Sequence, residues 1–342
     1  MTKKGFFFLA LIIIFGAIFR FYRIVELGTF LGDQATELLG TAKILRGDFT
    51  LIGIKTSISE VRNGAVMYYL MAPFLWLFRF DPVAGGVVQS LLSLATIVIV
   101  FFLGKSLGGE KLGLVAAFLI ATSALLVDYS RQTMLAHYPL FFVSLSLLLF
   151  WQILIRFIRL RIFLLGFLLG FMLQIHYSTL AVFLTAVAFP FLFLKRTQIF
   201  VYFLALLPGF ILGFSPMIAF ELRHEFFQTK MFVNYLKESS GGYFLSHLGA
   251  YFSYWPTVLG KLGAIFIFFL GVVTFFRYLQ GKLGRLEKLC LLQIAATALF
   301  VFLLVKENTA VHYAISAFVP IVLLTVGALF SLPNHILIVI LA

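Results

Sequence analysis

Two carboxylates that could take part in acid–base chemistry lie in the polar segment after the first apolar run. Asp33 stands in the stretch LGDQA, residues 31–35, and Glu37 follows one helical turn later. A positioned carboxylate can accept the proton of an attacking group, so Asp33 is the candidate catalytic base and Glu37 its substitute. An aspartate at a helix start is also commonly only an N-cap. The two roles are compatible, because one oxygen can accept a backbone N–H while the other faces a substrate.

Several cationic side chains in the polar segments could hold a phosphate group. The candidates are Lys55, Arg62, Arg131 and His176. The planar fork of an arginine matches phosphate oxygens in pairs. Arg131, in the stretch DYSRQ at the edge of an apolar run, has an equally simple structural interpretation as the anchor of a helix end.

Three histidines follow apolar runs or precede them, and all three are candidates for substrate binding. They are His137, His176 and His312, the last with Tyr313 beside it. Glu37 belongs to the same group of candidate binding residues. The histidines lack the spacing of metal ligands, so we predict no metal site and no cofactor. A divalent cation stays an open alternative that the spacing does not support.

The composition predicts that these residues stand on a membrane protein. Of 342 residues, 62% are hydrophobic and 11% are charged, whereas soluble domains have roughly 45–50% and 25%. The net charge of +13 is not a nucleic-acid footprint, because in such a chain the placement of Lys and Arg matters more than their sum. Membrane lipids are therefore expected partners, and nucleic acid is not. The single cysteine, Cys290, excludes an internal disulfide.

Apolar runs long enough to cross a bilayer recur along the whole chain, which we interpret as one all-α polytopic transmembrane bundle, residues 1–342. A span needs roughly 20 mostly apolar residues. The first run lacks a small-residue cleavage site, so we expect an uncleaved span. Ten candidate spans are 5–22, 83–104, 112–128, 138–155, 162–177, 178–194, 198–220, 257–276, 288–305 and 311–330.

Charge placement predicts the orientation of these spans. Basic residues cluster in the short loops that would share a side with the N-terminus, and only Glu110 and Glu287 lie there, which leaves eleven of the 13 acidic residues for the other side. Short basic loops are typical of the cytoplasmic face. We therefore predict a multi-pass protein of the plasma membrane with its N-terminus inside. The basic groups are Lys3 and Lys4; Lys105 and Lys111; Arg156, Arg159 and Arg161; Lys195 and Arg196; Arg277, Lys282, Arg285 and Lys288.

The two long polar segments, about 23–82 and about 221–256, then lie on the outer side, and we expect the functional site there. The apolar piece 64–80 contains Pro73, and a crossing would put every later basic loop opposite Lys3 and Lys4. We therefore place it along the outer interface. A helix from about 33 to 46 is predicted before it, with Ala35, Leu38, Ala42 and Leu45 sharing one face. The aromatic residues of 221–256 fit either a headgroup belt or a binding groove.

Two further patterns concern packing and the end of the chain. Gly166 with Gly170, and Gly209 with Gly213, form small-xxx-small pairs that favour close helix packing. Residues 335–342 begin another apolar run of only eight residues, far short of a span. We expect either a fragment of a longer chain or a vestigial last segment.

The ordered set of these motifs resembles the multi-pass GT-C glycosyltransferases, in the branch of protein O-mannosyltransferases and lipid A aminoarabinose transferases. This chain has Gln34 where many members have Glu, Ala136-His137 where many have an aspartate, and His312 where members often have Arg. The matching features, in chain order, are LGDQA at 31–35, GAVMYYL at 64–70, Ser130-Arg131, Gly170 with QIHYS at 174–178, and His312-Tyr313 with Pro320.

The resemblance implies a function as well as a fold. In that family the first-loop acid, here Asp33, is the catalytic base, and the donor is a sugar on a polyprenyl phosphate. The acceptor, whether protein, lipid or glycan, stays open. The alternative is a lipid-linked glycan transporter or flippase without transferase activity. A transporter of polar cargo typically has ionisable residues near the midplane or repeated halves, and the sequence has neither.

Overall fold

The computed structural model describes residues 1–56, 60–238, 265, 268–304 and 311–332. Predictions for the first part of 257–276, for the second long outer segment beyond 238 and for 335–342 lie outside these residues. The elements, in chain order, are α1 (Lys3–Phe21), α2 (Ile24–Leu27), α3 (Gly32–Leu45), β1 (Ile52–Lys55), β2 (Arg62–Gly64), α4 (Val66–Leu77), α5 (Val83–Gly108), α6 (Glu110–Thr122), α7 (Ala124–Ser130), α8 (Pro139–Ile155), α9 (Arg159–Ile175), η1 (Tyr177–Thr179), α10 (Leu180–Phe193), α11 (Arg196–Arg223), α12 (Phe227–Glu238), a helix at Phe268–Leu279, α14 (Arg285–Leu304), η2 (Val311–Ala317) and α15 (Phe318–Phe330).

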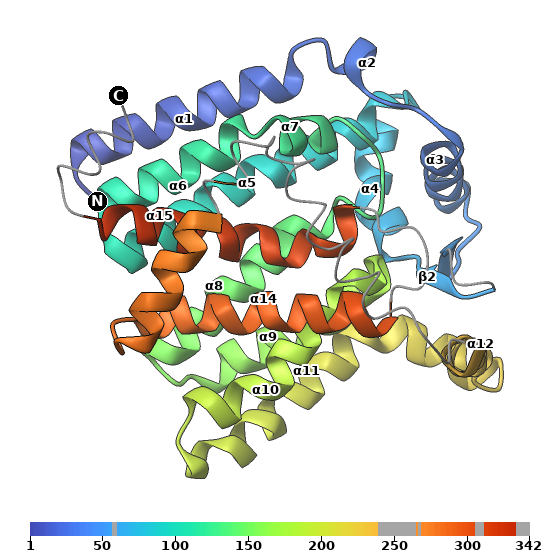
Figure 1. Ribbon diagram of the computed structural model, residues 1–342. Coiled ribbons are helices and arrows are strands. Elements are labelled where there is room, and N and C mark those ends of the chain that lie inside the picture. The colour runs from blue at the N-terminus through green and yellow to red at the C-terminus, as the bar shows by residue number, and fades with distance from the viewer. Residues whose placement is uncertain (57–59, 239–264, 266–267, 305–310, 333–342) are drawn as a thin grey trace.

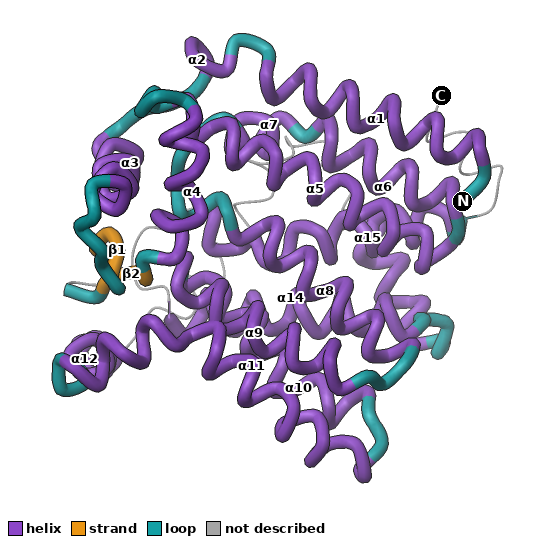
Figure 2. The backbone as a smooth tube through the Cα atoms, turned by 180° about the vertical axis from the view of Figure 1, so that it is seen from behind, coloured by secondary structure: helices purple, strands orange, loops and turns teal. Residues whose placement is uncertain are grey.

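The long helices lie side by side in one bundle (Figures 1 and 2), as the predicted polytopic all-α fold requires. Each of the ten predicted spans falls on a helix wherever its residues are described. Five helices are long and apolar enough to cross a membrane, or six if the bent pair α6–α7 counts as one span. Others, such as α8 and the 3-10 turn with α10, are apolar but shorter.

The basic loops gather at one end of this bundle, near the N-terminus (Figure 1). The backbone N–H of Thr2 donates to Glu110 of α6 at 2.9 Å. Arg285, at the start of α14, donates to the carbonyl oxygens of Leu154 and Phe193, which end α8 and α10. Loops that are far apart in the sequence, but were predicted to lie on the same side of the membrane, are therefore close together in space. We call this end the basic end.

The opposite end carries α2, α3, α4, α12 and the two short strands (Figures 1 and 2). β1 and β2 form an antiparallel hairpin that the sequence analysis did not predict. In Figure 1, α4 runs across the long helices rather than along them, as predicted for 64–80, although the helix continues through Pro73. We call this the hairpin end.

Close packing of α9 on α11 confirms the interpretation of the two glycine pairs. A Cβ added to Gly166 or Gly170 would strike the carbonyl oxygens of Leu206 and Phe210 on α11. A Cβ at Gly209 or Gly213 would strike backbone carbonyls of α9. The two backbones therefore touch directly, as small residues at helix interfaces permit.

A buried arginine of α1 joins the first span to α5 and α6. Arg20, which the sequence places at the edge of the first apolar run, is 0% exposed. Its guanidinium donates to Ser93 and to the carbonyl oxygens of Ile120 and Ala121. These carbonyls lie in the last turn of α6, just before the 59° bend that divides the predicted span 112–128 into α6 and α7. A cation is favourable at a helix C-terminus, so Arg20 stabilises the bend.

Candidate active site

Asp33 lies exposed at the hairpin end, on the first turn of α3. The helix begins after Leu31, and the side chain of Gln34 accepts the backbone N–H of Leu31 at 2.9 Å. Leu31 is the N-cap residue of α3, so the N-cap alternative for Asp33 does not apply. Within the described part of the chain no hydrogen bond engages the Asp33 carboxylate, which leaves both oxygens accessible to a ligand.

Glu37, one turn further along α3, faces the protein instead. It is 2% exposed, and its Oε1 accepts the backbone N–H of Leu135 at 2.9 Å. Burial raises the pKa of Glu37 well above its usual range, and the nearby Asp33 adds to the shift against the opposing effect of the Leu135 hydrogen bond. Glu37 is thus placed behind Asp33 rather than on the exposed face.

The buried face of α3 differs from the predicted apolar stripe. Glu37, Leu38, Thr41 and Ile44 are buried, whereas the predicted Ala35, Ala42 and Leu45 are only half-buried. Polar burial is possible here because the polar groups find partners: the Thr41 hydroxyl donates to the carbonyl of Glu37 at 2.9 Å, and Leu135 donates to the Glu37 carboxyl. Periodicity of apolar residues alone could not reveal this.

Two tyrosines that were not singled out from the sequence lie within electrostatic range of Glu37. Burial raises the pKa of Tyr68 to about 12, with a further contribution from Glu37 and an opposing one from Arg62. Tyr138 is fully buried and lies within electrostatic range of Glu37. Among the described residues, Glu37 Oε2 and the Tyr138 hydroxyl have no hydrogen-bond partner. Since buried polar groups are normally paired, these atoms are suited to a polar ligand.

The three candidate histidines come together from three separate elements, as expected for residues on one face. The rings of His176 and His312 meet edge to face at 5.4 Å between centroids, and Tyr313 lies 6.0 Å from His176. His137 interacts electrostatically with both histidines, and its ring stacks on Tyr129 at 3.7 Å. We call His137, His176, His312 and Tyr313 the histidine cluster.

The histidine cluster is better suited to hydrogen bonding and ring contacts than to metal binding or charge. Burial lowers the pKa of His137 to about 3, and His312 adds to the effect, so His137 is neutral at neutral pH. Its Nδ1 is buried and has no partner in the described part of the chain. No group of three or more His, Cys, Asp or Glu residues among the described ones could hold a metal ion.

The loop between α7 and α8 connects the two halves of the site. Its Leu135 holds Glu37, and two residues later its His137 enters the histidine cluster. The carboxylates of α3 and the histidines therefore lie around one short segment.

The candidate phosphate-binding cations have different surroundings in the structure. Arg131 donates to the backbone carbonyl of Phe19 near the end of α1, which is the anchoring role. Lys55 is exposed and pairs with Glu60 at 2.7 Å. Arg62, on β2, is half-buried and donates to the carbonyl of Gly53 at 3.3 Å. Arg62 is the cation that lies within electrostatic range of Tyr68 beside Glu37.

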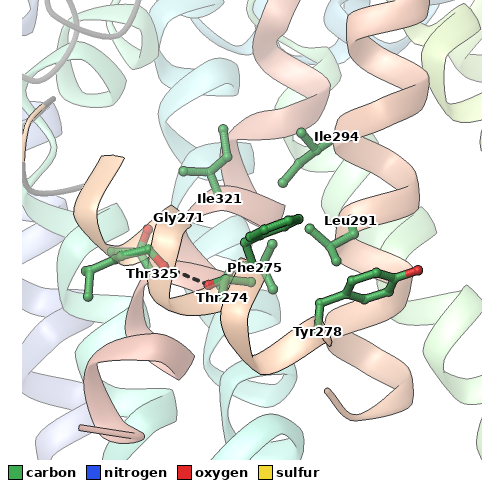
Figure 3. Close-up of a pocket in the computed structure, with 10 residues that line it drawn as sticks. Gly271, Thr274, Phe275, Tyr278, Leu291, Ile294, Ile321 and Thr325 are labelled. Atoms are coloured by element: carbon green, nitrogen blue, oxygen red, sulfur yellow. Dashed lines mark hydrogen bonds between the residues drawn. The ribbon is translucent and has the colours of Figure 1, made fainter. Parts of the chain in front are cut away.

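A cavity of about 310 Å³ lies elsewhere, between the helix Phe268–Leu279, α14 and α15 (Figure 3). None of the candidate site residues lines it. This cavity and the polar cluster are therefore separate features of this protein.

Structures similar to this chain are known, although their sequences differ widely from it. By sequence, the chain matches no protein-family model and no curated protein. By structure, it is similar to ArnT, the aminoarabinose transferase of Cupriavidus metallidurans, bound to undecaprenyl phosphate. The TM-score is 0.66 at 12% identity, over 98% of this chain and 62% of ArnT.

An archaeal enzyme is also similar in structure to this chain. The oligosaccharyltransferase of Archaeoglobus fulgidus, in complex with Zn and sulfate, matches with a TM-score of 0.57 at 13% identity, over 96% of this chain and 49% of that one. Its apo form matches with a TM-score of 0.60. The chain has the GT-C fold, as the sequence resemblance predicts. It spans less than two thirds of the length of each of these enzymes.

Proposed function

We propose that this protein is a glycosyltransferase that moves a sugar from a polyprenyl-phosphate donor to an acceptor, with Asp33 as the general base. The observation that carries the proposal is the exposed Asp33 carboxylate at the hairpin end of a bundle with the GT-C fold. This carboxylate forms no hydrogen bond with a described residue. The hairpin end is the outer face of the plasma membrane in this proposal, because the basic loops lie at the other end.

One carboxylate is enough for the chemistry. The acceptor's nucleophilic atom attacks the anomeric carbon, the bond between that carbon and the phosphate oxygen breaks, and Asp33 takes the acceptor's proton. A glycoside hydrolase needs a general acid because its leaving group is poor, but a polyprenyl phosphate leaves without protonation. The remaining requirement is cationic or polar stabilisation of the departing phosphate.

The donor fits the surroundings of the site. The neighbour ArnT was solved with undecaprenyl phosphate, and in this proposal the polyprenyl chain lies in the bilayer beside the apolar helices. Arg62 is the best placed cation for the phosphate, because it lies within electrostatic range of Tyr68, which Glu37 also influences. Lys55 would have to exchange Glu60 for phosphate, and Arg131 would have to release Phe19. The rings of the histidine cluster are suited to the sugar.

Replacing Asp33 by Asn tests the proposal. The substitution keeps the size of the side chain but removes its basicity, so transfer should fall on the order of 10²–10⁴-fold, the usual contribution of a general base. The assay is transfer of labelled sugar from a panel of polyprenyl-phosphate donors in reconstituted vesicles. The matched control is Asp48→Asn, an exposed carboxylate just past the other end of α3, which should keep full transfer.

Retained activity would remove Asp33 from the mechanism. If folded Asp33→Asn transferred sugar within a few-fold of the natural protein, the base would have to be another group, with Glu37 the next candidate. If the natural protein moved lipid-linked glycan across vesicles without any transfer, the transporter alternative would replace the enzyme.

A further inference from the structure

The cavity between the helix Phe268–Leu279, α14 and α15 is almost wholly apolar. Aliphatic and aromatic side chains such as Phe275, Leu291 and Ile294 point into it (Figure 3). The hydroxyl of Thr274 is turned away, because it donates to the carbonyl of Leu270 at 2.9 Å. With about 310 Å³, the cavity lies at the small end of the range for ligand pockets, roughly 300–1,000 Å³. It suits part of one hydrocarbon chain.

The backbone at one wall of the cavity is open. Gly271 lines the cavity, and a Cβ added there would meet no atom within 4 Å. A glycine in such a helix is usually explained by close packing, as for Gly209 on α11. Gly271 is exposed and has open space at its Cβ position, so a larger side chain would fit there.

The cavity lies toward the basic end of the bundle. Arg277, next to the lining residue Tyr278, pairs with Glu287 of α14 at 2.5 Å and ties the two helices together there. The helix ends at Leu279, and two residues later Gly281 turns the chain with a φ of +68°, which is accessible to glycine. Tyr278 is 52% exposed, and tyrosines of this kind mark the headgroup level of a bilayer.

Positive charge is concentrated in the segment that begins next to the lining residue Tyr278. Segment 277–288 contains four basic residues and one acid, Glu287, which leaves a net charge of +3 (four minus one). Arg277 is engaged with Glu287, and Arg285 is engaged with backbone carbonyls. Lys282 and Lys288 are exposed and form no ion pair with a described residue. Lys288 lies one helical turn before the lining residue Leu291 on α14.

We propose that this cavity binds one acyl chain of an anionic phospholipid of the bilayer, whose phosphate is held by Lys282 and Lys288. An apolar slot with exposed cations in the adjoining segment 277–288 matches a lipid whose chain is apolar and whose head is negative. A zwitterionic lipid could place its chain in the slot but would gain less from the lysines. This site does not depend on the glycosyltransferase proposal.

Lipid selectivity tests the proposal. The purified full chain is offered equal amounts of phosphatidylglycerol and phosphatidylcholine with the same acyl chains, and native mass spectrometry counts the bound molecules. Since a lysine near the headgroups favours anionic lipid by about fivefold, the two lysines predict a preference for phosphatidylglycerol on the order of tenfold to thirtyfold. The double variant Lys282→Gln/Lys288→Gln should bring the preference close to one.

Matched variants separate the head from the chain. Lys195→Gln/Arg196→Gln removes two exposed charges from another basic loop that does not line the cavity, and it should keep the preference. Gly271→Phe fills the slot and should reduce the binding of both lipids, and Gly271→Leu serves if the larger residue prevents folding.

Three results would overturn the site. They are an equal uptake of both lipids by the natural protein, an unchanged preference in the Lys282/Lys288 variant, and unchanged lipid binding in the filled Gly271 variant. Preferential displacement of phosphatidylglycerol by undecaprenyl phosphate at equal concentration would assign the cavity to the donor instead.

Discussion

The carboxyl of Glu37 accepts the backbone N–H of Leu135 at 2.9 Å, a bond between residues 98 positions apart in the sequence. Asp33 lies one turn earlier on the same helix, and His137 lies two residues later in the same loop. The bond therefore sets the position of the proposed base relative to the histidine cluster. A buried carboxyl that joins two elements should affect folding as well as activity.

Glu37 predicts a pH dependence of stability. Its pKa is raised in the folded protein, whereas in the unfolded chain it is about 4.3. The folded state therefore binds more protons, and stability falls as pH rises from about 4.3 through the raised pKa. Glu37→Gln keeps an oxygen acceptor for Leu135 but cannot titrate.

Thermal unfolding at a series of pH values checks this expectation. The two proteins should differ least in acid, and Glu37→Gln should gain on the natural protein as pH rises, because other titrating groups cancel in the difference. Parallel curves from pH 4 to pH 9 would mean that the carboxyl of Glu37 has an ordinary pKa in the folded state.

Arg20 should be among the most sensitive positions of the first span. Arg20→Leu leaves the Ser93 hydroxyl without its donor and the carbonyls of Ile120 and Ala121 without theirs. An unsatisfied buried polar group costs about 1–3 kcal/mol, so unfolding should become easier by at least that amount in a denaturant or thermal titration. Arg23→Gln, which breaks only an exposed 4.0 Å contact with Glu26, should change stability by less than about 0.5 kcal/mol.

The glycine contact between α9 and α11 predicts a contrast among three Gly→Ala variants. At Gly209 and Gly213 the new methyl group meets the backbone carbonyls of Phe163 and Phe167, and such overpacking costs about 1–3 kcal/mol. At Gly271 the space is open, and alanine should be tolerated. Thermal unfolding of the purified variants measures the contrast, which equal effects at all three sites would contradict.

Orientation can be read by labelling single cysteines in membranes. The background is Cys290→Ala, since that sole cysteine is buried. Probes at Arg159 and Lys195 should react only from the cytoplasmic side, and probes at Asp48 and Lys230 only from outside. Because 64–80 lies along the hairpin end, reporters after Arg62 and after Phe80 should indicate one side. Labelling of Lys195 and Lys230 from the same side would defeat the orientation.

The sequence by itself determined the class of fold and much of its plan. Apolar length sets the helices, because a backbone in lipid must satisfy its own hydrogen bonds. The spacing of Gly209 and Gly213 predicted a close helix contact, and the charge count predicted that 64–80 stays at one end. These properties are local or additive along the chain, so no tertiary information is needed to read them.

The tertiary structure decided which polar residues are inside and which meet. Nothing local distinguishes Glu37, which is buried because Leu135 reaches it, from Asp33, which is exposed on the same helix. Arg20 is buried because α6 presents two carbonyls at its bend. The histidine cluster joins residues 137, 176 and 312, which no spacing rule connects. A buried polar group is stable only with a partner, and that partner lies far away in the sequence.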